Sequence, residues 1–352
     1  MKNELVSRFN ANPLLSPKDI KPSREGLEVV CLLNPGAFVF NNKTWLIVRV
    51  AERPKQTNGL ISFPVLQPDG EIEIIKIQKS EIDALHSDER VIRFREKDYL
   101  TTLSHLRLLC SDDGIKFYEP AGYPPLMGKG NLQNFGIEDC RVSKINNTYY
   151  LTFTSVSENG VGVGLKITED WKNFVSHDMI IPPHNKDCAI FENKINGTYY
   201  ALHRPSSVNI GGNYIWLASS PDAVHWGNHR CIIKTRENSW DSERVGAGAA
   251  PIKTSKGWLE IYHGANKKNQ YCLGAFLMDL NDPSKIIARS SQPIMMPTAE
   301  YERCGFFGNV VFTNGHIIQP NGDTVTIYYG ASDEYVCAAN VSINEILSSL
   351  NV

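Results

Sequence analysis

Short runs of alternating apolar and polar residues recur along the chain, and each begins at a polar turn. Five runs share one form, in which Asn, Gly, Lys or Ser residues precede an aromatic or β-branched stretch. They are NNKTWLIVRV (41–50), NNTYYLTFTS (146–155), NGTYYALHRP (196–205), SKGWLEIYHG (255–264) and NGDTVTIYYG (321–330). Asn-Asn and Asn-Gly tolerate the positive φ that tight hairpin turns need. The pattern therefore predicts that each run is the second strand of a β-hairpin.

Further strands flank each predicted hairpin. A short apolar strand such as EDCRVSKI precedes the turn, and another such as YCLGAFLMDL follows the second strand. Five copies of a unit with three or four strands predict an all-β fold, a five-bladed β-propeller. A β-sandwich also contains many short strands, but repetition of one hairpin favours radial closure.

Three segments lie outside this repeat. The interval between the first and second runs is the longest, which predicts an insertion within residues 54–103. SINEILSSL (342–350) starts with Ser and carries apolar residues at helical spacing, so it predicts a short C-terminal helix. Residues 1–25 read as an extended N-terminal arm, which either wraps its own propeller or packs on a neighbouring subunit of a homo-oligomer. Residues 1–352 are thus expected to form one propeller domain.

Composition narrows the classes of partner. The chain is 42% hydrophobic and 21% charged with a formal net charge of −2, whereas proteins that bind nucleic acid usually carry a basic surplus. The first residues lack an apolar core of signal-peptide length, and no apolar run is long enough to span a membrane. We therefore expect a cytoplasmic protein with neither a nucleic acid nor a membrane partner. Eight scattered cysteines with no CxxC pair predict neither disulfides nor a metal site.

Polar residues occupy matching places near the starts of the predicted innermost strands. They are Asn34, Glu138 and Asp139, Lys186 and Asp187, Arg244, and Asn309. Because the innermost strands of a propeller line its central channel, these side chains should converge on one cavity. The alternative is that the carboxylates of Glu138 and Asp139 are a solvated strand end.

A second polar set lies at the ends of the second strands. It comprises Arg49, Arg204, His263 and, just past the fifth run, Asp333. An unpaired buried cation is costly, so Lys186, Arg204 and His263 form a candidate anion site. The alternative is three unconnected salt bridges, to Asp187, Asp241 and Glu260.

Several motifs carry a family resemblance. They are GIEDCRV (136–142), HNKDCAIF (184–191), ALHRPSS (201–207), WDSERVGAGAAPI (240–252), IYHGA (261–265) and IYYGASD (327–333). In this order, from about Asn34 to Leu347, the chain resembles glycoside hydrolase family 130, the β-mannoside phosphorylases. Within the family it is most similar to the β-1,2-mannobiose and β-1,2-oligomannoside phosphorylases. It departs from many relatives at Cys140, where they have Pro, and this change should leave the preceding acid in place.

The resemblance implies roles for individual residues. Asp139 would be the general acid, and inorganic phosphate the nucleophile, held by Lys186, Arg204 and His263. Sugar contacts would fall on Asn34, Arg49, Asp187 and Asp333, with Arg53 at the second sugar, and the pattern of strand starts adds Glu138 and Asn309 to the substrate-binding set. Phosphate is then a co-substrate, and neither a cofactor nor a metal is expected.

The expected reaction is inverting phosphorolysis of β-1,2-linked mannobiose or manno-oligosaccharides, giving α-mannose 1-phosphate. Inversion requires an acid at the leaving oxygen and a nucleophile on the opposite face of the ring. Asp139 should therefore keep its proton, with a pKa raised above the usual value by burial and by Glu138. The proton would travel directly or through a sugar hydroxyl. The alternatives are a β-mannosidase that uses water, a β-1,4-mannoside phosphorylase, and a sugar-binding propeller without turnover.

Overall fold

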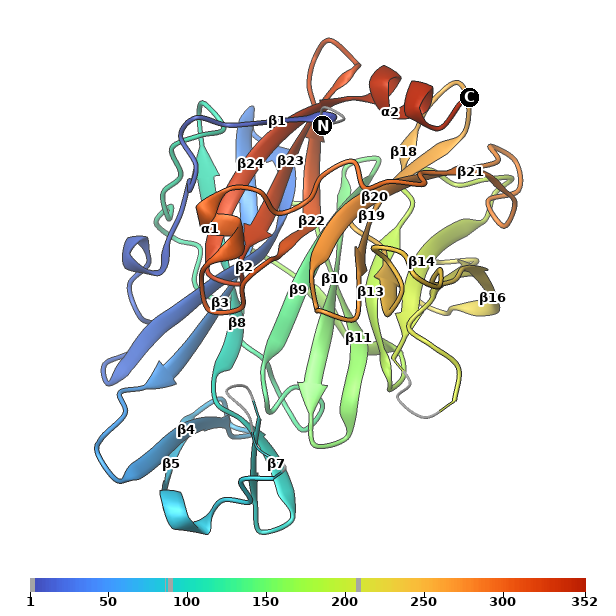
Figure 1. Cartoon of the computed structure of the whole chain (residues 1–352). Helices are drawn as coiled ribbons and strands as arrows, with labels where there is room; N and C mark the ends of the chain where they lie inside the picture. The colour runs from blue at the N-terminus through green and yellow to red at the C-terminus, as the bar shows by residue number, and fades with distance from the viewer. Residues whose placement is uncertain (1–3, 86, 88–90, 207–209) are drawn as a thin grey trace.

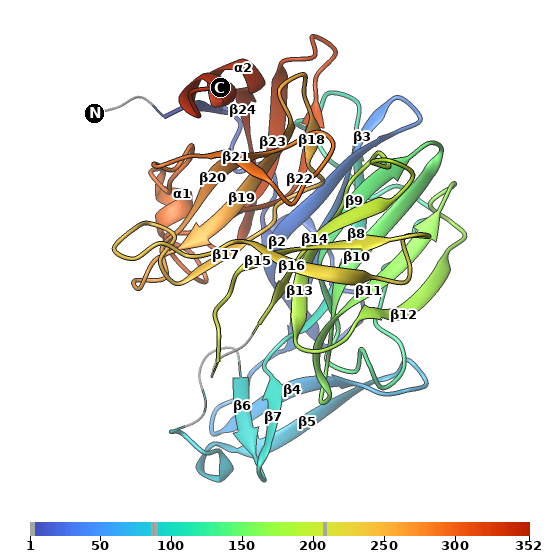
Figure 2. The same cartoon turned by 90° about the vertical axis from the view of Figure 1, so that its right-hand side faces the viewer.

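Five β-sheets surround one central axis in the computed structural model, which describes residues 4–85, 87, 91–206 and 210–352 (Figures 1 and 2). Each sheet is antiparallel, and its strands follow one another along the chain from the innermost strand to the outermost, except at the edges of two blades. The predicted all-β, five-bladed propeller is confirmed.

The blades have the following strands. Blade one comprises β2 (Leu27–Phe40), β3 (Lys43–Pro54) and β8 (Leu103–Ser111). Blade two comprises β9 (Ile137–Ile145), β10 (Thr148–Ser157), β11 (Gly160–Thr168) and β12 (Val175–Ile181). Blade three comprises β13 (Asn185–Ile190), β14 (Tyr199–Pro205), β15 (Ile215–Ser220) and β16 (Gly227–Ile233). Blade four comprises β17 (Arg244–Gly246), β18 (Ile252–Lys253), β19 (Trp258–Ala265), β20 (Tyr271–Met278) and β21 (Ile286–Arg289). Blade five comprises β22 (Val311–Ile318), β23 (Thr324–Ala331), β24 (Tyr335–Ser342) and β1 (Val6–Arg8).

The five predicted second strands are β3, β10, β14, β19 and β23, and each pairs with the strand before it. The turns adopt the backbone that their residues favour: φ is 50° at Asn41, 57° at Asn146 and 51° at Asn196. Asn reaches this left-handed region more easily than most side chains do. The polar turns thus set the register of the repeats, as expected.

Helices are few and short in the described part of the chain. They are η1 (Pro17–Asp19), η2 (Lys79–Glu81), α1 (Glu300–Arg303) and α2 (Ile343–Ser349). The helix α2 falls within the segment predicted to be helical, and the Ser342 side chain caps it by accepting a hydrogen bond from the Glu345 amide. None of these helices has the length and the apolar character that a membrane crossing requires.

The N-terminal arm closes the ring by completing the fifth blade. Strand β1 pairs with β24, with Val6 opposite Val341 and Arg8 opposite Ala339. Further along the arm, Leu15 forms a β-bridge with Val336. The arm was expected to pack either on its own propeller or on a neighbouring subunit, and in the structure it packs on its own propeller. Residues 1–3 lie outside the described part.

The long interval between the first two repeats holds two hairpins, inserted between β3 and β8. They are formed by β4 (Leu60–Leu66) with β5 (Ile72–Gln78), and by β6 (Val91–Phe94) with β7 (Lys97–Leu100). The insertion has a small apolar core of Phe63, Ile77 and Ile92. Strand β1 and the C-terminus lie at the end of the molecule opposite this insertion (Figures 1 and 2). Residues 86 and 88–90 of the insertion are outside the described residues.

Candidate active site

In each of three innermost strands, a backbone irregularity turns one polar side chain toward the central channel. Asn34, Asp139 and Asp187 have positive φ values of 39°, 49° and 53°. The strand register shifts at each of them, in the pairings of β2 with β3, β9 with β10, and β13 with β14. Bulges bend a strand and redirect side chains, and Asn and Asp tolerate left-handed backbone better than other polar residues. The acid of GIEDCRV is therefore turned into the channel by its own strand.

These bulges open into one cavity of about 630 Å3 at the mouth of the channel. Its lining includes eight of the predicted site residues: Asn34, Arg49, Glu138, Asp139, Lys186, Asp187, Arg204 and Asp333. Asp139 is only 8% exposed and Asp187 2%. The carboxylates of GIEDCRV thus face a shared cavity, and the alternative of a solvated strand end is wrong.

Asp139 is held through one of its two carboxylate oxygens. Its Oδ1 accepts hydrogen bonds from Asn34 Nδ2 at 3.1 Å and from Arg49 Nη1 at 3.2 Å. Arg49 Nη2 also donates to Glu138 Oε1 at 2.7 Å, so a single guanidinium fixes both carboxylates. Within the described residues, Asp139 Oδ2 has no hydrogen-bond partner. Of the two oxygens, Oδ2 is therefore the one left unengaged in a side chain that lines the cavity.

The pKa of Asp139 differs from the expectation. Burial raises this pKa, but the positive charges of Arg49, Arg141 and Lys186 outweigh burial and leave it below its ordinary value. The predicted increase is therefore wrong. The reason is that Glu138 is paired with Arg49, so the cations around Asp139 dominate its surroundings.

Asp187 gathers basic side chains from blades two, three and four. Its Oδ2 lies 3.0 Å from Arg204 Nη1 and 3.3 Å from His263 Nε2, and its Oδ1 lies 3.1 Å from Arg141 Nη2. Burial raises the pKa of Asp187, but Arg204, Arg141 and His263 outweigh burial and hold it well below the usual value. This carboxylate is therefore charged at neutral pH.

The ring of His263 is fully buried, and burial lowers its pKa to about 4, so it is neutral near pH 7. Because Arg204 and His263 meet on the same carboxylate, the alternative of three unconnected salt bridges is wrong. Of the other two proposed partners, Asp241 pairs with Arg236 and Arg289.

The small residues of GAGAAP make room for this cluster. A Cβ atom on Gly246 would lie 2.3 Å from Asp187 Oδ2 and 2.4 Å from His263 Nε2. Any side chain there would push the carboxylate and the imidazole apart. The glycine in β17 therefore permits the close approach of blades three and four.

Lys186 stands directly opposite Arg204 in the pairing of β13 with β14. Like charges at opposed positions of a sheet repel each other. Arg204 is compensated by Asp187, whereas the Lys186 ammonium has no ion pair within the described part of the chain. Both side chains line the cavity. The pair is therefore suited to hold a small anion.

Three predicted site residues lie elsewhere. Arg53 lies near the end of β3, the middle strand of blade one, where its Nε donates to Glu28 Oε1 at 2.9 Å, and it lines a separate cavity beside the insertion. His263 lies behind Asp187, beneath the cavity surface. Asn309 is exposed on the loop after α1 and does not line the cavity.

The blade-five bulge is at Asn314, where the pairing of β22 with β23 shifts between Thr313 and Gly315. Asn314 Nδ2 donates to Asn34 O at 3.0 Å. Asn314 stands seven positions before its turn, as Asn34 and Asp139 do, so that spacing could have identified it.

Comparisons with known proteins identify the family. The family model described as "beta-1,4-mannooligosaccharide phosphorylase", that of glycoside hydrolase family 130, matches residues 83–351. The chain belongs to glycoside hydrolase family 130. It is 43% identical to beta-1,2-mannobiose phosphorylase of Listeria innocua, over 99% of both chains. The solved complex of that Listeria enzyme with beta-1,2-mannobiose matches with a TM-score of 0.93 and 42% identity, covering 98% of this chain and 99% of the other. A 1,2-beta-oligomannan phosphorylase of Thermoanaerobacter is 37% identical over 69% of this chain and 80% of its own length.

In this member of family 130, the sequence did not reveal the part played by Arg141, which is 1% exposed. Its guanidinium donates to Asp139 O at 3.0 Å, to Asp187 Oδ1 at 3.1 Å and to Gly248 O at 2.8 Å. It thereby joins the bulges of blades two and three to blade four. A charged residue inside the apolar strand of GIEDCRV was the available signal.

Further cavity residues come from blade four and from the loop after α1. Arg244 Nη1 donates to the Tyr271 hydroxyl at 2.9 Å, and both side chains line the cavity. Phe306 and Phe307 add aromatic surface beside them. Within the described residues, no group of three or more His, Cys, Asp or Glu side chains is arranged to hold a metal ion.

Proposed function

We propose that this chain is an inverting β-1,2-mannoside phosphorylase. The reaction is the reversible cleavage of β-1,2-mannobiose, or of longer β-1,2-linked chains, by inorganic phosphate. The C1–O bond of the glycoside breaks, a phosphate oxygen bonds to C1, and the proton goes to the leaving oxygen. The products are α-mannose 1-phosphate and mannose, or a chain shortened by one sugar.

The observation that carries this proposal is the arrangement of Asp139 against Lys186 and Arg204 in one cavity. Inversion needs a proton donor at the leaving oxygen and a nucleophile on the opposite face of the sugar ring. Phosphate is already an anion, so it needs cations that hold it in line and no second carboxylate to activate it. Lys186, opposed to Arg204 and without an ion pair in the described region, supports the anion site. Such positioning and charge compensation contribute several kcal/mol in comparable sites.

Asp139 is proposed as the general acid, through Oδ2. Its lowered pKa is compatible with that role if phosphate binds before the proton is transferred. Lys186 is among the cations that lower the Asp139 pKa, and a phosphate dianion on Lys186 would offset that charge and raise it. The carboxyl then takes up a proton as phosphate binds. Transfer from Oδ2 to the glycosidic oxygen runs directly or through a hydroxyl of the sugar.

Asn34, Arg49, Glu138, Asp187 and Asp333 are proposed to bind the sugar whose C1 is attacked. All five line the cavity beside Asp139. We propose that His263 acts indirectly, by supporting Arg204 and Asp187, because it contacts both side chains on the side away from the cavity. As proposed, the reaction needs neither a cofactor nor a metal, because phosphate is a co-substrate.

The β-1,2 linkage is proposed on the strength of the 43% identity over nearly the whole chain with an enzyme named for β-1,2-mannobiose. The family model carries a β-1,4 name, so a β-1,4-mannoside phosphorylase is the competing specificity. We place the reaction in the cytoplasm: each of the eight cysteines is a free thiol, and thiols persist in a reducing compartment.

The test is product analysis with β-1,2-, β-1,3- and β-1,4-mannobiose, each with and without phosphate. We expect α-mannose 1-phosphate from the β-1,2 substrate, and only when phosphate is present. Free mannose released at the full rate without phosphate would identify a hydrolase. Binding of mannobiose without any product would identify a sugar-binding propeller. Either result would overturn the proposal.

A further inference from the structure

Glu302 is a fully buried carboxylate in α1, at the foot of the loop that reaches the cavity. It accepts hydrogen bonds from the amides of Thr298 and Ala299, at 2.8 and 2.9 Å, and from the Tyr329 hydroxyl at 2.8 Å. Its side chain is 0% exposed. A buried carboxylate is costly unless it is both paired with a cation and hydrogen-bonded. The cation that faces it comes from the opposite end of the sequence.

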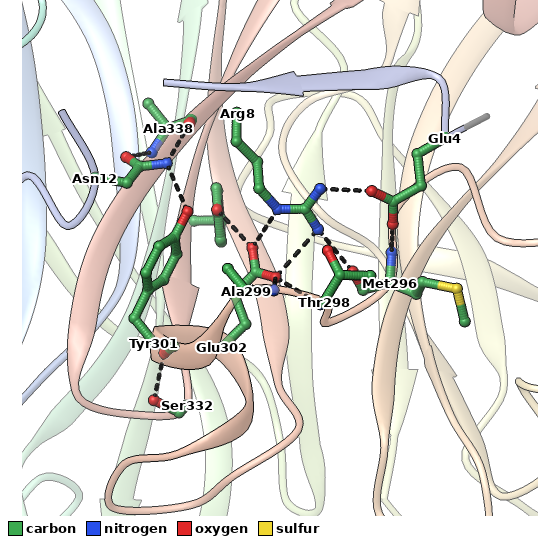
Figure 3. A network of polar contacts seen from close by, with 11 residues as sticks. Glu4, Arg8, Asn12, Met296, Thr298, Ala299, Tyr301, Glu302, Ser332 and Ala338 are labelled. Atoms are coloured by element: carbon green, nitrogen blue, oxygen red, sulfur yellow. Dashed lines mark hydrogen bonds and ion pairs between the residues drawn. The ribbon is translucent and has the colours of Figure 1, made fainter. Parts of the chain in front are cut away.

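That cation is Arg8, the last residue of β1 (Figure 3). Its Nε lies 2.7 Å from Glu302 Oε1 and its Nη2 3.1 Å from Oε2, so the pair is bidentate. The rest of the guanidinium is held by Glu4 Oε2 at 2.5 Å and by the Met296 carbonyl at 2.7 Å. Burial lowers the pKa of Arg8, but its bonds to Glu302 and Glu4 outweigh burial and raise it. Bidentate pairs of this kind fix orientation as well as charge.

Glu302 begins the loop 302–310, which hydrogen bonds hold in place and which reaches the cavity. The Val310 amide donates to Glu302 O at 3.0 Å, closing the loop 302–310 at its base. Ser332 Oγ lies 2.7 Å from Tyr301 O and 3.0 Å from Cys304 O, so it holds the other side of that loop. At the tip of the loop are Phe306 and Phe307, here called the aromatic wall, which line the cavity.

The order of the blades puts the aromatic wall across the cavity from Lys186 and Arg204, the two cations of the proposed anion site. Phe306 packs against Cys31, Leu33 and Ala51 of blade one, while its own loop enters blade five. Lys186 and Arg204 belong to blade three. In a ring of five blades, the third faces the junction of the fifth and the first. Since the nucleophile and the leaving group occupy opposite faces of the reacting sugar, the aromatic wall borders the leaving-group side.

We propose that Arg8 is a positioning residue for the leaving-group sugar, acting through Glu302 on the aromatic wall. The inference rests on the proposed function, because it takes the mannose released in phosphorolysis as the sugar that meets Phe306 and Phe307. Arg8 touches no substrate. It fixes the loop 302–310 to the blade that the N-terminal arm completes, so the arm contributes to substrate selection as well as to ring closure.

The test compares Arg8→Met with Glu4→Gln, which removes the negative charge of the outer partner of the same guanidinium and leaves the pair with Glu302 intact. In the synthetic direction, from α-mannose 1-phosphate and mannose, we expect Arg8→Met to raise the KM for acceptor mannose at least about tenfold. Displacements of about 1 Å remote from the chemistry can cost about a hundredfold. The KM for phosphate in phosphorolysis should change less than twofold, and Arg8→Lys should restore part of the loss. Glu4→Gln should resemble the unmodified protein in every constant.

Hydrogen exchange supplies a readout that needs no turnover. Amides of residues 299–310 should exchange at least about tenfold faster in Arg8→Met than in Glu4→Gln, at a temperature where circular dichroism reports both variants as folded. Unchanged exchange in this segment would overturn the proposal, even in a protein that failed to phosphorolyse mannobiose. Equal increases in the KM for mannose and for phosphate would also overturn it, since they would indicate general loss of structure. If Arg8→Met does not fold, Arg8→Lys against Glu4→Gln decides by the same two measurements.

Discussion

Lys186 offers a direct test of the anion site, because its removal should cost the folded protein little. The side chain is half-buried, and its ammonium makes no ion pair within the described residues, whereas Arg204 beside it neutralises the buried Asp187. Removing Arg204 would leave that carboxylate under-compensated, which is strongly destabilising. Lys186→Met removes a charge that opposes Arg204 across the strand pair. The free energy of unfolding should therefore change by no more than about 0.5 kcal/mol.

The effect on phosphate should be much larger. A hydrogen bond to a charged group contributes about 1.5–3 kcal/mol. At about 1.4 kcal/mol per factor of ten, Lys186→Met should raise the KM for phosphate roughly ten- to 150-fold. The KM for β-1,2-mannobiose should stay within about twofold. Initial rates of α-mannose 1-phosphate formation, with each substrate varied in turn, measure both constants. Lys194→Met is the matched control, since it removes an exposed lysine of the same blade at the turn between β13 and β14.

The same variant should change the pH profile in a defined direction. Lys186 is among the cations that lower the pKa of Asp139, so its removal raises that pKa. The protonated acid then persists to higher pH, and the alkaline limb of kcat/KM for mannobiose should move upward relative to Lys194→Met. An unchanged KM for phosphate would refute the anion site. An equal rise in both Michaelis constants would show that Lys186 acts on the cavity as a whole.

Two further substitutions test the carboxylates. Asp139→Asn keeps the Oδ1 acceptor for Asn34 and removes the proton donor. The rate of phosphorolysis should therefore fall about a hundredfold or more, while binding of mannobiose, measured by calorimetry, persists. Near-normal turnover would exclude the role of Asp139 as the acid. Asp187 has a folded-state pKa depressed well below the usual value, so it stabilises the fold above about pH 4 and loses that contribution as the pH falls toward the folded-state pKa. Urea unfolding should show that the free energy of unfolding falls less between pH 7 and pH 3 in Asp187→Asn than in the unmodified protein, although the variant is about 3–5 kcal/mol less stable at pH 7. Equal decreases in the two proteins would contradict a charged, ion-paired Asp187.

The sequence predicted the blades because local signals repeat. Each Asn-rich turn precedes one alternating strand, and turn geometry with alternation is enough to set a hairpin and its register. The insertion followed from the one long interval. The place of β1 did not follow, because nothing within Val6–Arg8 distinguishes a blade edge from a free arm. Its partner strand lies at the far end of the sequence, and such pairings depend on tertiary packing.

The part of the site that could be predicted is the part built from equivalent positions of the repeats, because those positions meet at the central channel. Asn34, Asp139 and Asp187 sit at bulges, and an Asn or Asp just before an apolar strand is a residue type that bulges accept. How far each side chain lies from the cavity surface could not be predicted. His263 ends its strand as Arg204 does, yet it lies beneath the cavity, because Gly246 leaves room for Asp187 between His263 and the cavity. The pKa of Asp139 was also missed, since the charges of Arg49 and Arg141 lower it, and the reach of Arg141 across three blades appears only in the folded chain.

The closure of the ring by β1 has a consequence for how the protein is made. Strand β1 is made before the other described strands of the ring, yet it pairs with β24, the last of them, and the contact between Arg8 and Glu302 spans almost the same stretch. Contacts so distant in sequence form late and slowly. During synthesis β1 therefore stays without its partner until β24 has been made, and the cavity acquires its final contour only when the first and last strands of the ring meet.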